Sequence, residues 1–284
     1  MTAAISLYEV GPRDGLQSLD RQIPRRKKVK LVKMLRRAGI DNIEIGSLVH
    51  PSVTSMRESE KIFKKTGGDL LVLNQRGLQR ALVAGATSVN VSISTSESFI
   101  AKNQNTSYEE AKLFYERVAT IIPINRLYIS CCFSPDVTED EILKCVEWGK
   151  TIASCIVLCD TDSNAKTEPV MSLCKKAKQI TPNIAVHFHL TDQVEECVQT
   201  AYDAGIRVYD CSIGGLGGCF SLENPEGNVS TEALVEWAER NGIPLEQTIK
   251  PRKLNAAGKY AYGLQVSRSE RFTEWLYHKI GMYI

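Results

Sequence analysis

Two histidines separated by one residue, His187 and His189, are the first residues whose spacing suggests chemistry. They lie in the apolar segment VHFH, and residues i and i+2 of a β-strand point to the same face. Both imidazoles would therefore face one way and Phe188 the other. With an aspartate such as Asp14, two imidazoles form a mixed nitrogen and oxygen ligand set for a divalent cation. The alternative is a pair of core histidines that hydrogen-bond to backbone, and the HxH pattern alone does not separate the two.

Two predicted loops carry further candidate residues. Arg13 and Asp14 stand side by side after the first apolar segment, in EVGPRDGLQ, and such a pair in a turn is more often structural when nothing else is known. Cys219 follows four glycines in GGLGGC, a composition that makes a loop easy to move and able to close over a site. A lone cysteine is usually inert, but on such a loop it is a candidate acid or base.

Short apolar segments alternate with amphipathic ones along the chain, and this alternation predicts the elements that position these residues. Helical spacing of apolar residues predicts intervening helices, and Gly39, Gly85 and Gly205 are expected to end three of them. We predict helices over 27–38, 107–121, 193–204 and 230–241. Segments rich in β-branched residues predict eight buried parallel strands at 5–10, 42–46, 70–73, 88–93, 126–132, 155–159, 184–189 and 207–212.

Eight strands, each followed by a helix, predict an α/β fold with a single (β/α)8 TIM barrel. The chain has 284 residues, which suits a barrel of this kind. An open doubly wound sheet is the alternative, but no glycine-rich GxGxxG motif follows the first strand. We expect the catalytic barrel to span 1–242. Residues 243–284 are expected to form extra C-terminal helices packed on the barrel or on a partner subunit.

Composition argues against several other classes of protein. The net charge is +2, so no overall field attracts nucleic acid or a membrane surface. The chain shows no signal peptide, and no apolar stretch reaches about 18 residues. Nine cysteines scattered through apolar segments predict reduced thiols and hence a cytoplasmic location. The basic run at 25–28 is expected to be a solvated helix end.

In such a barrel the active site lies at the carboxyl ends of the strands. Four motifs stand there, EVGPRDGLQ (9–17), IEIGSLVHP (43–51), VHFH (186–189) and GGLGGC (214–219), and SESFIAKNQNTSYEEA (96–111) follows the fourth strand. Together they resemble the 3-hydroxy-3-methylglutaryl-CoA lyase family, metal-dependent barrel enzymes related to isopropylmalate and homocitrate synthases. The resemblance runs from about residue 5 to 235. The Gly-Pro before Arg13 and the Gly-Gly-Cys loop favour the lyases over the synthases.

The resemblance implies a role for each candidate residue. Arg13 would face the thioester oxygen, Glu44 would lie beside the metal, and Cys219 would be the catalytic residue of the glycine loop. The implied ligands of a divalent cation, Mg²⁺ or Mn²⁺, are Asp14, His187, His189 and Asn228. The implied substrate-binding residues are Gln17, Asp160 and Thr161.

The implied reaction is the retro-Claisen cleavage of 3-hydroxy-3-methylglutaryl-CoA, or a similar 3-hydroxyacyl thioester, to acetyl-CoA and a 3-oxo acid such as acetoacetate. A metal that holds the 3-hydroxyl lowers its pKa, and a guanidinium stabilises the developing enolate oxygen. Two alternatives stay open: a condensing or aldol enzyme of the same family that acts on a 2-oxo acid, and a non-catalytic metal-binding barrel. We expect a small-molecule substrate, no nucleic-acid or membrane partner, and a homodimer.

The loops after the last four predicted strands depart from the lyase pattern. The sixth strand ends in Cys-Asp-Thr-Asp-Ser at 159–163, where the family has Gly-Asp-Thr-x-Gly. The histidine pair is followed by Leu190 and Thr191 rather than Asp-Thr. The sequence therefore defines the reaction type better than the acyl group.

Overall fold

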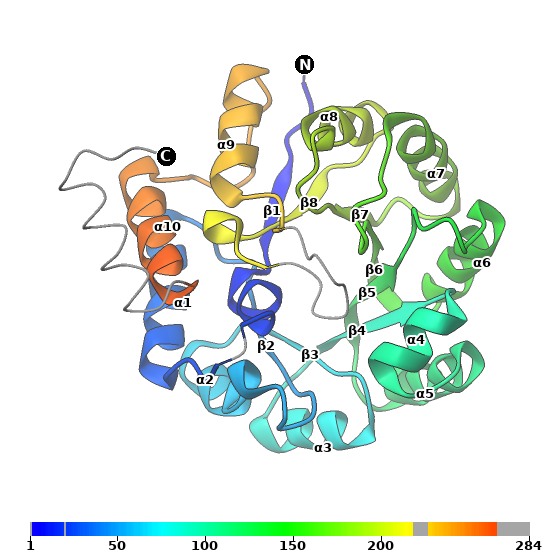
Figure 1. Cartoon of the computed structure of the whole chain (residues 1–284), viewed down its shortest axis with the longest axis horizontal. Coiled ribbons are helices and arrows are strands. Elements are labelled where there is room, and N and C mark those ends of the chain that lie inside the picture. Colours follow the sequence, from blue (N-terminus) through cyan, green and yellow to red (C-terminus); the bar gives the residue numbers. More distant parts are fainter. Residues whose placement is uncertain (1, 20, 218–226, 266–284) are drawn as a thin grey trace, which may run out of the picture.

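The computed structural model describes residues 2–19, 21–217 and 227–265. Eight parallel strands form one sheet in the order β1-β8-β7-β6-β5-β4-β3-β2, and the helices lie in a ring outside them (Figure 1). A parallel bridge between Glu9 and Ile43 links the two ends of this order, so the sheet is nearly closed. The predicted (β/α)8 barrel is confirmed.

All eight predicted strands are present, and each end lies within two residues of its predicted position. Alternating side chains face the barrel interior and the surrounding helices, as in other closed parallel sheets. The strands are β1 (Ser6–Glu9), β2 (Glu44–Ser47), β3 (Asp69–Leu71), β4 (Val89–Ser94), β5 (Ile124–Ser130), β6 (Ala153–Cys159), β7 (Ile184–His187) and β8 (Val208–Cys211).

The predicted helices are also present, and their ends follow the expected capping chemistry. Ser107 and Glu110 form a capping box at the start of α5, and Gly39 ends α1 with a φ of 101°, a conformation that favours glycine. The α-helices are α1 (Arg25–Ala38), α2 (Ser59–Thr66), α3 (Gln75–Ala84), α4 (Glu97–Gln104), α5 (Tyr108–Ile121), α6 (Glu139–Gly149), α7 (Thr167–Ile180), α8 (Val194–Asp203), α9 (Thr231–Arg240) and α10 (Pro251–Gln265).

The expectation of a solvated basic helix end is wrong for Lys28. Its side chain is buried, and its ammonium donates hydrogen bonds to the backbone carbonyls of Ser55 and Arg57. Burial lowers the pKa of Lys28 to about 8. The lysine therefore holds the loop after β2 against α1 rather than facing solvent.

The described C-terminal residues pack against the first strand and the first helix. Leu245 forms a parallel bridge with Ile5, and the Tyr260 hydroxyl of α10 donates to the carbonyl of Lys27 over 3.4 Å. Lys30 lies 4.5 Å from the ring of Tyr260. This part of the chain contacts the barrel closely, and the division into domains at residue 242 stays a prediction.

Eight cysteines are described, and all eight are free thiols. Among the described helices, none has the length and apolar composition needed to cross a membrane.

Candidate active site

The short π-helix η1 (Gly11–Gly15) follows β1 and carries the adjacent Arg13 and Asp14. The Arg13 guanidinium is buried and forms ion pairs with Asp14 and with Glu44 at the start of β2. Burial alone would raise the pKa of Asp14, but Arg13 and the two histidines hold it below its usual value. The pair is therefore a structural contact and at the same time part of a larger cluster.

The two histidines face the barrel interior from the end of β7, as the HxH spacing predicts. Their rings lie 5.1 Å apart, centroid to centroid, and both are buried. The Phe188 ring packs with Phe133 at 6.3 Å. His187 Nδ1 lies 3.4 Å from the Asp210 carboxylate, and His189 Nδ1 lies 2.5 Å from the carbonyl oxygen of Asp160. These contacts leave each Nε2 as the nitrogen on the side of Asp14, and that of His187 lies 3.9 Å from the Asp14 carboxylate.

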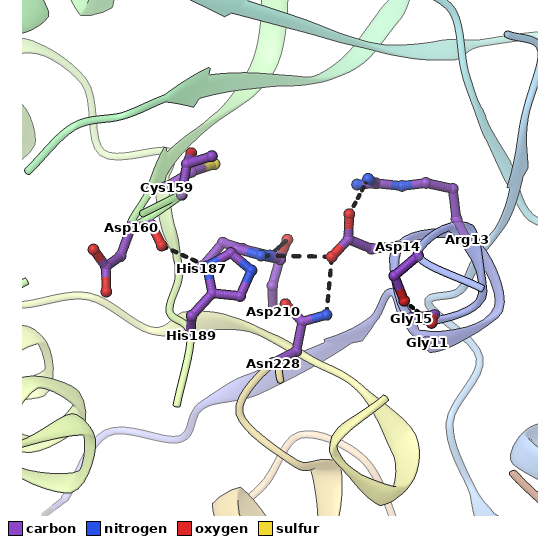
Figure 2. Close-up of polar contacts among 12 residues, drawn as sticks. Gly11, Arg13, Asp14, Gly15, Cys159, Asp160, His187, His189, Asp210 and Asn228 are labelled. Atoms are coloured by element: carbon purple, nitrogen blue, oxygen red, sulfur yellow. Dashed lines mark hydrogen bonds and ion pairs between the residues drawn. The ribbon is translucent and has the colours of Figure 1, made fainter. Parts of the chain in front are cut away.

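Asp14, His187 and His189 form a group that could hold a metal ion, because their donor atoms all lie within 4.8 Å of one another. Figure 2 shows Asp14 and the imidazoles converging on one region, with Asn228 below them. The Asn228 amide nitrogen donates to Asp14 over 2.9 Å and to the carbonyl of Leu216 over 2.9 Å.

Two buried atoms in this cluster lack a partner among the described residues. They are Nε2 of His189 and Oδ1 of Asn228. Buried polar atoms are almost always paired, so an unpaired imidazole nitrogen and an unpaired amide oxygen at one place are suited to coordinate a cation. Burial and the neighbouring His187 lower the pKa of His189 to about 4, which keeps that imidazole neutral and able to ligate. The residues present fit a divalent cation.

Glu44 lies outside this group and acts through Arg13. Its carboxylate is fully buried, pairs with the Arg13 Nε and accepts a 2.6 Å hydrogen bond from the Asn90 side chain. Burial raises the pKa of Glu44, whereas Arg13 opposes that shift. Glu44 thus holds the guanidinium in place and reaches the Asp14 cluster only through Arg13.

A cavity opens at the carboxyl ends of the strands, directly above this cluster. Gln17 and Thr161, two of the three predicted substrate-binding residues, line it. Its other lining residues are Arg13, Asp14, Leu71, Leu73, Ser92, Phe99, Asn103, Tyr128, Ser130, Cys159, His187 and His189. The cavity thus combines the charged cluster at one side with apolar and hydroxyl-bearing walls.

The third predicted substrate-binding residue, Asp160, points away from the cluster (Figure 2). Its carboxylate accepts the backbone N–H groups of Asn164 and Ala165, at 2.8 and 2.9 Å. Burial raises its pKa to about 6. Asp160 therefore orders its own loop and, through its carbonyl, orients His189.

Ser163 stands in that loop at the position of the second glycine of the family pattern, and it keeps a left-handed φ of 59°. Cys219, the last predicted catalytic residue, lies outside the described residues.

Sequence reasoning missed a polar layer inside the barrel, beneath the cluster. Arg126 on β5 forms a buried ion pair with Asp210 on β8, which in turn contacts His187. The guanidinium carbon of Arg126 lies 3.8 Å from the Tyr8 ring centroid. A charged residue within an apolar strand, such as the aspartate of VYDC, could have indicated this layer. A buried charge at such a position requires a partner of opposite charge inside the barrel.

The fold and the cluster agree with the comparison to known proteins. A family model described as HMGL-like matches residues 4–260. The chain belongs to the HMGL-like family. The resemblance inferred from the motifs is therefore confirmed.

Relatives that are similar to this chain over most of its length include carbon–carbon lyases. The mitochondrial hydroxymethylglutaryl-CoA lyase of Arabidopsis thaliana is 34% identical over 90% of this chain, but the chain spans only 58% of that protein. The hydroxymethylglutaryl-CoA lyase of Bacillus subtilis is 32% identical, and the match covers 90% of this chain and 91% of that one. An HMG-CoA lyase structure from Acinetobacter baumannii, in complex with coenzyme A and 3-methylmalate, matches 93% of both chains with 28% identity and a TM-score of 0.85.

Proposed function

We propose that this chain cleaves 3-hydroxy-3-methylglutaryl-CoA to acetyl-CoA and acetoacetate. The observation that carries the proposal is the convergence of Asp14, His187 and His189 beside the buried Arg13, at the mouth of a barrel of the HMGL-like family. Asn228 is the proposed fourth ligand, because its Oδ1 is buried and unpartnered at the same place. Mg²⁺ or Mn²⁺ suits this set of oxygen and imidazole ligands.

The reaction removes the 3-hydroxyl proton, breaks the C2–C3 bond and leaves the electron pair on the thioester as an enolate, which takes up a proton to become acetyl-CoA. A bound divalent cation supplies Lewis acidity toward the substrate hydroxyl. Arg13 lines the cavity, and its two carboxylate partners hold the guanidinium in one orientation. A donor fixed in this way stabilises the enolate oxygen without reorganising during the reaction.

Two further parts of the proposal concern the wall and the loop. Gln17 and Thr161 contact the acyl part of the substrate from the cavity wall. Cys219, which we propose as the acid that protonates the enolate carbon, rests on the sequence motif alone. Coenzyme A as the carrier draws support from the A. baumannii lyase, which is similar to this chain and binds coenzyme A.

The test is a turnover assay with purified protein and Mg²⁺ or Mn²⁺, in which mass spectrometry follows the products. The panel contains 3-hydroxy-3-methylglutaryl-CoA, other 3-hydroxyacyl-CoAs and 2-oxo acids with acetyl-CoA. We expect acetoacetate and acetyl-CoA from the first substrate. Condensation of a 2-oxo acid without cleavage of that thioester would favour the synthase-like alternative, and turnover of no substrate would favour a binding barrel.

Metal analysis separates ligation from a packing role of the histidines. His187→Ala should lose bound Mn²⁺, whereas the matched control His50→Ala, on the loop after β2, should keep it. Undiminished Mn²⁺ in His187→Ala would refute the ligand set.

The remaining expectations are a cytoplasmic location and a homodimer. Free thiols at the eight described cysteines support a reducing compartment. The homodimer stays a prediction, and light scattering of the purified protein tests it directly.

A further inference from the structure

Glu9, at the end of β1, is a fully buried carboxylate that the mechanism above does not use. Its Oε1 accepts two backbone hydrogen bonds, from Gly11 N at 2.7 Å and from Ile213 N at 2.9 Å. Its Oε2 accepts the Thr231 hydroxyl at 2.6 Å. Gly11 opens the segment that carries Arg13 and Asp14, and Ile213 opens the segment after β8. One carboxylate thus ties together the starts of two loops.

A second carboxylate supports the same segment after β8. Glu232, in the first turn of α9, accepts the Gly214 N–H at 2.9 Å. The backbone N–H groups of residues 213 and 214 therefore each donate a hydrogen bond to a different carboxylate. Such charge-assisted hydrogen bonds are the strong ones, and they hold this backbone in one position.

The two loops touch further along, at a place with no room for side chains. A Cβ at Gly217 would lie 2.4 Å from the Asn228 amide nitrogen and 3.0 Å from Gly15 Cα. A Cβ at Gly15 would lie 2.7 Å from the Leu216 Cβ. The backbones therefore pack directly, and a small slip of one loop along the other would change the 2.9 Å contact between Asn228 and Asp14.

We propose that Glu9 is a positioning residue for the metal site, which holds the loops after β1 and β8 in register so that Asp14 and Asn228 face one another. Its effect on metal binding rests on the proposed ligand set, and only its effect on turnover rests on the proposed reaction. Removing the carboxylate would leave two buried N–H groups without an acceptor, and the loops would have to shift to satisfy them.

The isosteric variant separates positioning from charge. In Glu9→Gln the amide oxygen can accept both backbone N–H groups, and the amide nitrogen can donate to Thr231. We therefore expect Glu9→Gln to bind Mn²⁺ as the wild type does, and Glu9→Ala to bind it at least about tenfold more weakly, as is typical when a residue that orients metal ligands is lost. Mn²⁺ binding is followed by the electron paramagnetic resonance signal of the free ion.

The matched control is Leu78→Ala, a buried residue of α3, which Figure 1 places on the opposite side of the barrel from α9. This control should lower the unfolding temperature without changing the Mn²⁺ dissociation constant. Thr231→Val, which removes one of the three donors to Glu9, serves if Glu9→Ala does not fold, and it should weaken Mn²⁺ binding by a smaller factor. Unchanged Mn²⁺ affinity in Glu9→Ala, or in Thr231→Val if that is the variant that folds, would overturn the proposal, as would an equal loss in Leu78→Ala. A protein that binds Mn²⁺ as expected but cleaves no thioester would refute the proposed function and leave this inference standing.

Discussion

The burial of Glu9 predicts an unusual dependence of stability on pH. Desolvation raises the pKa of Glu9 from 4.5 to about 7, and Glu232 adds repulsion, although the hydrogen bonds from Thr231, Ile213 and Gly11 oppose the shift. An acid whose pKa is higher in the folded state binds its proton more tightly there. Its contribution is therefore fully present below the unfolded pKa and is lost as the pH rises toward 7.

The size of the effect follows from the two pKa values. One pKa unit corresponds to about 1.4 kcal/mol, so a shift from 4.5 to about 7 changes the free energy of unfolding by about 3 kcal/mol over the whole titration. Between pH 5.5 and pH 8 the wild type should lose about 2 kcal/mol of this contribution. Glu9→Gln cannot titrate there, so its free energy of unfolding should rise by about 2 kcal/mol relative to the wild type across the same interval.

Equilibrium unfolding in urea at several pH values, for both proteins in the same buffers, measures this difference. Titrating groups remote from Glu9 are shared by the two proteins and cancel in the comparison, whereas Glu232 and Cys211 interact with the Glu9 charge and belong to the measured difference. Parallel curves that differ by a constant from pH 5.5 to pH 8 would refute the reasoning. They would mean that the three hydrogen bonds fully compensate the burial of the charge.

Four further changes test the site. Arg13→Met should lower kcat by about 10²-fold or more and leave Mn²⁺ binding intact, because a fixed donor to the enolate oxygen is lost; an equal loss of metal would make Arg13 only a structural partner of its carboxylates. Asp210→Asn should weaken Mn²⁺ binding by about tenfold, because His187 loses its orienting carboxylate, and isothermal titration measures this. Ser163→Gly should stabilise the protein by about 1 kcal/mol in urea unfolding by relieving the left-handed φ; no gain would show that the loop carries no strain there. Alkylation of Cys219 should abolish turnover, and a substrate analogue with metal should slow its labelling in peptide maps; labelling that is slow and insensitive to ligand would exclude a lid role.

Much of the fold follows from local patterns. Strand after strand is a short apolar segment rich in β-branched residues, and each helix shows its own spacing and caps, as Ser107 and Gly39 illustrate. These signals depend on neighbours a few residues away, so they can be read without the tertiary structure. The common face of His187 and His189 belongs to the same class, because it needs only the period of a strand.

Other features arise only from contacts between distant segments. Asp14 and Asn228 are 214 positions apart, and only the closed barrel brings them within hydrogen-bond distance. The burial of Lys28 depends on where the loop after β2 crosses α1. The turn of Asp160 away from the cavity depends on backbone amides of its own loop that had no detectable sequence signal.

The residue types and their local spacing thus determined the elements, the barrel and the kind of chemistry. The tertiary structure decided which polar groups meet. The sequence pattern around a carboxylate does not distinguish one that lies beside two imidazoles from one that pairs with an arginine or accepts backbone N–H groups of two loops, as Asp14, Asp210 and Glu9 respectively do. These carboxylates differ only in the partners that the tertiary structure brings to them. A buried charge requires a partner, but the local sequence does not show which residue that partner is.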